Sequence, residues 1–175
     1  MAWASLIISA LLVAAVGAPA EHAEPEARYV GPAPLTWSAC LAEFDIASAV
    51  DELRVTDQFA SPRINYAGEP SRQGCAFATI AEDPDAQVWF EELFASAEVP
   101  GQLYALTGLW LENRRLFRRY AADLDLASAP PIQQQIGCMG GTASPQELLD
   151  ALRDGGIPKM FKYFLKERAE ARESN

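Results

Sequence analysis

The cysteines are the residues of this chain with the widest range of possible chemistry. There are three, and Cys138 lies among glycines in the stretch QQQIGCMGGT, residues 133–142. A thiol becomes a nucleophile or redox centre when a nearby cation or helix N-terminus lowers its pKa. The helix start predicted nearest to Cys138 has Ser144 at its N-cap, so the thiol itself does not occupy that position. Redox chemistry is therefore the less favoured interpretation of this stretch.

A structural disulfide is the favoured role for two of the cysteines. Three cysteines allow three pairings and leave one thiol over. We expect Cys75 to pair with Cys138, because each follows a glycine at the edge of a predicted helical segment, where the backbone can approach closely. In the chain-entropy description such a bridge contributes roughly 4 kcal/mol. Cys40 is then expected to be a buried free thiol that packs as a small hydrophobe.

Most other catalytic arrangements lack an essential residue. The only histidine is His22, close to the N-terminus, so neither a Ser–His–Asp nor a Cys–His arrangement has a general base in the body of the chain. Three scattered cysteines cannot form a four-thiolate zinc site. The glycine-rich patterns that cradle phosphates are also missing. The sequence therefore predicts no cofactor and no metal.

Carboxylates are plentiful, and two carboxyl groups can act as general acid and base on a glycoside. Glu91 and Glu92 are adjacent in a predicted helix and so point apart, and Asp51 and Glu52 have the same arrangement. A solvated acidic surface is the favoured interpretation. A cofactor-independent hydrolase with a carboxylate pair remains an alternative, but no residue is assigned to catalysis.

A cluster of arginines is the most localised charge feature. Arg114, Arg115, Arg118 and Arg119 lie in NRRLFRRYAADL, where pairs four residues apart share one side of a helix. Such a patch could bind an acidic protein or an anionic component of the cell envelope through bidentate contacts. The alternative is local neutralisation by acidic neighbours such as Glu112 and Asp123, which is common on exposed helices.

The charge balance and the N-terminus limit the compartment and the partners. The formal net charge is −10 and the pI is about 4.5, which disfavours nucleic-acid binding.

The apolar run of residues 6–16 is too short to span a bilayer and is followed by small residues. This pattern is typical of a signal peptide, residues 1–20, with cleavage after Ala20. We expect a periplasmic or extracellular protein; an uncleaved N-terminal anchor is the alternative.

Beyond residue 20 the apolar spacing indicates helices. A lead-in rich in Pro, Ala and Glu, residues 21–36, precedes a single domain of residues 37–168 and a frayed polar tail, residues 169–175. Segments 56–74 and 127–143 collect turn-forming residues and are predicted to be a long loop and a flexible connector. The remaining segments carry helical spacing and are predicted as helices within residues 37–55, 74–82, 83–97, 102–111, 113–124, 144–156 and 158–168.

Two of these helix predictions rest on capping chemistry. Asp83 is the expected N-cap of the helix over 83–97, with Pro84 in its first turn. Ser144, followed three residues later by Glu147, has the spacing of a capping box. The segment GCAFATIAE, residues 74–82, resembles a strand in composition but is short and has no evident partner, so we expect a helix.

The pattern predicts an all-α fold of antiparallel helical pairs, either HEAT- or armadillo-like or an irregular bundle. The pair within residues 84–124 has the size of a HEAT repeat unit, and residues 144–168 could form another. The aromatic side chains fall at core-facing positions and are expected to pack in the interior.

Short motifs in the middle of the chain carry a family resemblance. GQLYALTGL at 101–109, Phe117, Tyr120 and the pair Gly137–Cys138 resemble a group of uncharacterised exported bacterial proteins, over about residues 65–150. The position of Thr107 is often cysteine in that group, so the cysteine pattern of this chain departs from it. The resemblance implies export and no known activity. Together these observations predict an exported binding or interaction module, with a hydrolase or a thiol-redox protein as alternatives.

Overall fold

The computed structural model describes residues 35–126 and 128–174. The predicted signal peptide, its cleavage after Ala20, most of the lead-in and His22 lie outside these residues. The helices are α1 (Trp37–Ala42), α2 (Ile46–Arg54), α3 (Arg72–Ala81), α4 (Ala86–Ser96), α5 (Val99–Glu112), α6 (Arg114–Asp123), α7 (Pro145–Arg153) and α8 (Gly156–Glu173). The strands are β1 (Gln58–Ile64), β2 (Glu69–Pro70), β3 (Ile132–Gly137) and β4 (Met139–Ala143).

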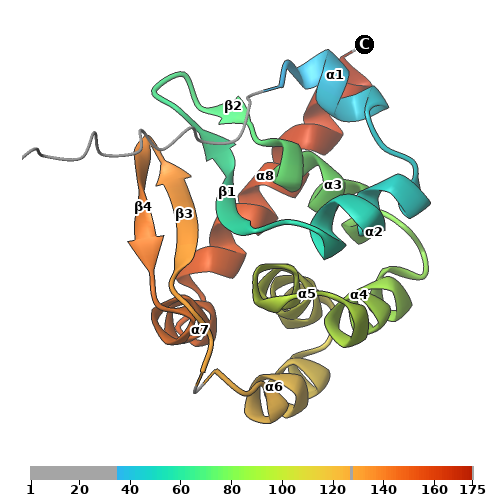
Figure 1. The fold of residues 1–175 in the computed structure, drawn as a ribbon. Helices are drawn as coiled ribbons and strands as arrows, with labels where there is room; N and C mark the ends of the chain where they lie inside the picture. The colour runs from blue at the N-terminus through green and yellow to red at the C-terminus, as the bar shows by residue number, and fades with distance from the viewer. Residues whose placement is uncertain (1–34, 127, 175) are drawn as a thin grey trace, which may run out of the picture.

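The strands form one mixed sheet, so the prediction of an all-α, HEAT- or armadillo-like fold is wrong. The strand order is β2-β1-β3-β4, with β1 and β3 parallel and the two outer pairs antiparallel. Figure 1 shows the sheet at one side of the molecule, with α8 running behind it and α5 at the centre, beside α4 and α6. The architecture is α+β.

Strand β1 occupies the segment predicted as a loop. Phe59 and Ile64 are fully buried, which ties the strand to the core. Pro62 has no N–H for a sheet ladder, and the register with β3 shifts between Ala60 and Ile64. The carbonyl of Pro62 instead accepts a hydrogen bond from Ser71 N at 2.9 Å, at the start of α3. The proline that suggested a loop therefore sits in a local irregularity of the strand.

The predicted connector is a β-hairpin. Strands β3 and β4 pair from Ile132 opposite Ala143 to Ile136 opposite Met139. Gly137 and Cys138 are left as a two-residue turn, and Gly137 has the positive φ of 59° that tight hairpin turns need at their first position. The glycines here shape a turn and an edge strand rather than a flexible link.

An aromatic cluster joins the sheet to the helices. The ring of Tyr104 on α5 stacks on Phe59 of β1, with 4.7 Å between centroids, and Phe161 of α8 packs 4.4 Å from Phe77 of α3. The hydroxyl of Tyr104 donates to the Ala60 carbonyl at 3.0 Å and accepts from the Ala60 amide at 2.7 Å. Helix α5 is thus hydrogen-bonded directly to β1, the strand that pairs with β3. Helix α5 is itself buried over most of its length.

The capping predictions have different outcomes. Ser144 and Glu147 form the expected capping box at the start of α7. The N-cap of α4 is Asp85 rather than Asp83, because the Asp83 carboxylate instead accepts from Asp85 N and from the indole N–H of Trp89. The polar C-terminal segment is helical as far as Glu173. Within the described part of the chain, no helix is long and apolar enough to cross a membrane.

Candidate functional site

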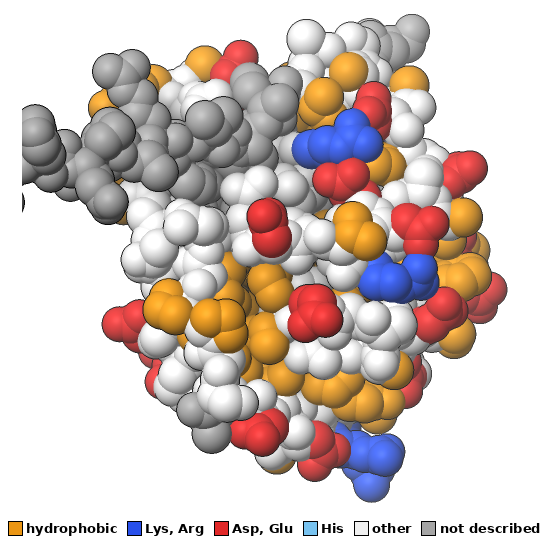
Figure 2. Space-filling view, in the orientation of Figure 1, with side chains coloured by type: hydrophobic (Ala, Val, Ile, Leu, Met, Phe, Trp, Pro, Cys, Tyr) orange, Lys and Arg blue, Asp and Glu red, His pale blue; other side chains and the backbone are white. Residues whose placement is uncertain are grey.

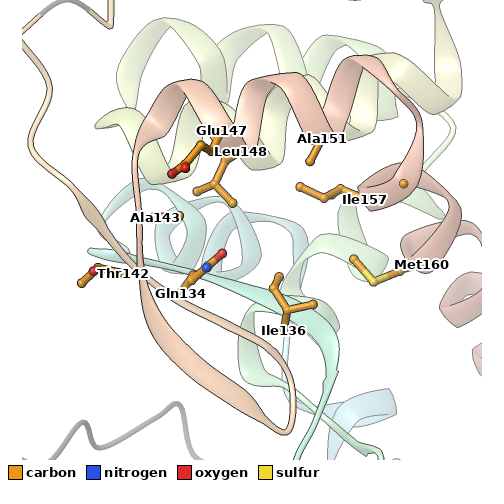
Figure 3. Close-up of a pocket in the computed structure, with 10 residues that line it drawn as sticks. Gln134, Ile136, Thr142, Ala143, Glu147, Leu148, Ala151, Ile157 and Met160 are labelled. Carbon is orange, nitrogen blue, oxygen red and sulfur yellow. The ribbon is translucent and has the colours of Figure 1, made fainter.

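A groove opens between the β3–β4 hairpin and the two C-terminal helices. It has a volume of about 570 Å³ and is lined mainly by apolar side chains. Figure 3 shows Leu148 and Ala151 of α7 above it, Ile157 and Met160 of α8 at one side, and Ile136 of β3 below. Because α7 directly follows β4 and α8 directly follows α7, one continuous segment of chain forms most of this groove.

A second recess extends the groove along α8. It has a volume of about 370 Å³ and shares Ile136 and Met160 with the first. Tyr163 and Phe164 continue its apolar lining toward the C-terminal half of α8. Tyr163 is 69 % exposed, and Met139, which pairs with Ile136 at the tip of the hairpin, is 70 % exposed. The two recesses therefore meet at Ile136 and Met160 and together form one elongated apolar groove, with the exposed Tyr163 in its lining.

The charged groups beside the groove are already bonded within the protein. Arg63 donates from Nε to Glu167 at 2.8 Å, and its guanidinium lies over the ring of Trp37. Glu147 accepts from the Ser144 amide at 2.8 Å, and its bonds to the amide and hydroxyl of Ser144 lower the pKa of the Glu147 carboxyl. Arg63 and Glu167 therefore neutralise each other, and Glu147 is an anionic carboxylate whose oxygen is bonded to Ser144.

The outer edge of β4 is the second feature of this site. Strand β4 pairs with β3, and no other described strand pairs with it. Its five residues, MGGTA, contain no charge and no proline, the usual devices that protect an edge strand. The opposite edge, β2, has two residues, one of them Pro70, whose carbonyl accepts from Leu35 N at 2.9 Å. Of the two edges, β4 is therefore the one open to a further strand.

Gly141 connects this edge to the groove. Alternate residues of a strand face the same side, so Gly141 faces the same side as its pairing partner Gln134, which lines the groove. A Cβ placed at Gly141 would meet nothing within 4 Å. Thr142 also lines the groove, whereas Gly140, the partner of Gln135, faces the other side of the sheet and lines neither recess. Gly141 therefore leaves open space on the side of the sheet where Gln134 lines the groove.

The disulfide differs from the expected one. Cys40 and Cys75 are bonded, with 5.2 Å between their Cα atoms, and Cys138 is an exposed free thiol. Helices α1 and α3 pack against each other and against α8, which brings Cys40 and Cys75 together. Cys138 lies at the tip of the hairpin instead. The predicted Cys75–Cys138 pairing and the buried free Cys40 are therefore wrong.

The predicted arginine patch lies on α6. Arg114, Arg115, Arg118 and Arg119 are all exposed, and none forms an ion pair with a carboxylate of the described residues. Neutralisation by Glu112 or Asp123 is therefore not seen. Acidic side chains are spread over the face drawn in Figure 2, whereas basic ones gather at a few places, one of them at its lower end, over α6.

The carboxylates considered for hydrolysis are bonded to other side chains. Glu91 accepts from the Tyr120 hydroxyl at 2.8 Å, and this hydrogen bond raises the pKa of Tyr120. Glu52 accepts from Arg72 Nε at 2.8 Å, while Asp51 and Glu92 both pair with Arg54. Among the described residues, no group of three or more His, Cys, Asp or Glu side chains could hold a metal ion.

Neither the apolar groove nor the free edge was expected from the sequence. The available signal was weak, because Ile132 and Ile136 fall on one side of a strand but all three residues between them are glutamines. No protein-family model, no curated protein and no solved structure matches this chain.

Proposed function

We propose that this chain is an exported binding module that holds an extended peptide segment along the edge of β4. Alternate apolar side chains of the peptide enter the groove between the hairpin and helices α7 and α8. The observation that carries the proposal is the juxtaposition of an unprotected edge strand with an apolar groove on the adjoining face of the same sheet.

The edge supplies affinity and the groove supplies selectivity. A strand added to β4 would form main-chain hydrogen bonds with any peptide sequence. Every second side chain of that strand would fall on the side of the sheet that Gln134 and Gly141 share. Because Gly141 leaves open space there, one such side chain could reach the apolar walls formed by Leu148, Ala151 and Met160.

Two further observations support the export and the kind of ligand. Disulfides such as Cys40–Cys75 persist in oxidising compartments and are rare in the cytosol. The lining of the groove is mainly apolar, and the two charged groups at its far end, Arg63 and Glu167, neutralise each other. A peptide with alternating apolar side chains suits this lining better than a highly charged one.

The test is a titration with short capped peptides in which Leu, Ile, Val or Phe alternates with Thr. A matched set carries N-methyl groups on every second amide, which removes the donors needed for strand pairing. We expect saturable binding of at least one unmodified peptide and at least about tenfold weaker binding of its N-methylated form, a difference of about 1.4 kcal/mol.

Two variants of β4 separate the groove from the rest of the surface. Gly141→Phe fills the open space on the groove side and should weaken peptide binding at least about tenfold. Gly140→Phe places the same ring on the opposite side of the same strand, at a residue that lines neither recess, and should change affinity less than about twofold. Equal effects of both variants would contradict the proposal. Saturable binding of a fatty acid such as laurate, with no binding of any of the peptides, would contradict it as well.

A further inference from the structure

A separate recess lies between α6 and the C-terminal end of α7. It has a volume of about 350 Å³ and is lined by Arg114, Phe117, Arg118, Ala121, Ala122 and Arg153. Phe117 and Ala121 are 5 % and 4 % exposed and form its floor. It shares no lining residue with the apolar groove. Three of its six lining side chains are guanidinium groups, contributed by two helices.

Two of the arginines are held in place by contacts with other residues of the protein. Arg153 donates from Nη1 to Asp150 at 3.1 Å and from Nη2 to the Ala121 carbonyl at 3.2 Å, which links α7 to α6. The guanidinium of Arg114 lies on the face of the Trp110 ring. A guanidinium stacked on a ring keeps its N–H groups at the periphery, where they can donate to a ligand. These two donors are therefore positioned before any ligand arrives.

The positive charge on the α6 side of the recess is not neutralised. Arg114 and Arg118, four residues apart on α6, pair with no carboxylate of the described chain. Like charges at this spacing destabilise a helix. Desolvation of the guanidinium by neighbouring side chains, followed by the charge of Arg118, lowers the pKa of Arg114. Arg114 and Arg118 thus form a local unpaired positive charge in a chain whose formal net charge is −10.

We infer that this recess binds a phosphate group, with Arg114 and Arg118 on one side and Arg153 on the other. A phosphate dianion has the charge to offset both unpaired arginines, and its tetrahedral oxygens can accept from donors on two helices at once. A carboxylate carries one charge and two oxygens in one plane, so it cannot satisfy all three guanidinium groups. The inference does not depend on the peptide groove.

The experiment is a calorimetric titration of the full chain with inorganic phosphate and with pyrophosphate at low ionic strength. Arg114→Gln and Arg118→Gln each remove one charge from the recess, and we expect affinity to fall at least about tenfold. Arg115→Gln and Arg119→Gln remove the same charge from the same helix but from residues outside the lining. These controls should lower affinity less than about threefold, the size expected of a general field effect.

Vesicles distinguish a free phosphate from a lipid headgroup. If the natural source is a lipid, the wild type should sediment with phosphatidylcholine vesicles that contain phosphatidic acid, and Arg118→Gln should not, whereas Arg119→Gln should. If the source is soluble, phosphate or pyrophosphate binds and the vesicles do not. Equal losses of affinity in all four arginine variants would overturn the inference. It would also be overturned if acetate bound as tightly as phosphate, or if the protein bound neither phosphate, pyrophosphate nor the vesicles.

Discussion

At the residue scale, single side chains connect segments that are far apart in the chain. Arg168 is 1 % exposed and donates to the Cys75 carbonyl at 2.9 Å and to the Thr79 hydroxyl at 3.0 Å, so it joins α8 to α3. Burial lowers the pKa of Arg168, and the nearby Glu82 carboxylate opposes that shift. The Cys40–Cys75 disulfide fastens α1 to the same helix. Helix α3 is therefore held from two sides.

The disulfide leads to a prediction about stability. Its cysteines are separated by 35 residues, and in the chain-entropy description a closed loop of this length contributes roughly 3–4 kcal/mol. We expect the double variant Cys40→Ser/Cys75→Ser to lose about that much unfolding free energy in urea under non-reducing conditions. Cys138→Ser, at an exposed position, is the control and should change stability by less than about 0.5 kcal/mol. A large loss from Cys138→Ser alone would contradict the pairing.

At the element scale, close helix packing sets the position of α5. A Cβ at Gly108 would overlap the buried ring of Phe90 on α4. Alanine is intrinsically better than glycine in a helix by about 1 kcal/mol, but overpacking against a rigid buried ring costs up to about 3 kcal/mol. The steric effect therefore exceeds the propensity gain, and Gly108 is present because α4 and α5 approach closely.

We accordingly expect Gly108→Ala to lower the unfolding free energy by about 2 kcal/mol, measured by urea denaturation. Gly156→Ala in α8 serves as the matched control, since its Cβ would make only an ordinary contact, 3.7 Å from the Ala151 carbonyl. That variant should be neutral or slightly stabilising. If both alanine variants had the same effect, the close approach of α4 and α5 would be incorrect.

The capping box of α7 makes part of the folding stability depend on pH. Because the folded-state pKa of Glu147 is lowered from its ordinary value of 4.5, its carboxylate stabilises the fold fully above that value. The contribution is lost as the pH falls through the lowered folded-state pKa. Glu147→Gln keeps a hydrogen-bond acceptor but removes the charge.

We expect the stability difference between wild type and Glu147→Gln to be constant from pH 7 to about pH 5 and to shrink below about pH 4.5. Urea denaturation at a series of pH values measures it. A difference that grew on acidification would mean that the carboxylate is not stabilised in the folded state.

At the scale of the whole molecule, local patterns predicted the helices but not the sheet. Capping residues and apolar spacing are short-range signals, and they located α4, α5 and α7. The pairing of β1 with β3 joins residues such as Ile64 and Gly137, which are distant in sequence, and no local pattern encodes it. Pro62 in β1 and three glutamines in β3 further masked the strand character.

The site was missed for the same reason. Its groove and its free edge exist only once the hairpin has folded against α7 and α8, so no single segment displays them. The disulfide likewise depends on how α1 and α3 pack on α8 rather than on glycines beside the cysteines. The arginine cluster, by contrast, was visible because its four members share one helix, although the contribution of Arg153 was not.

The proposal of a peptide added at β4 is tested most directly by amide hydrogen exchange with and without a bound alternating peptide. The account predicts slower exchange at Gly140, Gly141 or Thr142 on binding, because main-chain donors on the outer edge of β4 become bonded. Exchange in α6, which does not line the groove, should stay unchanged. Saturable peptide binding with unaltered exchange throughout β4 would contradict the account.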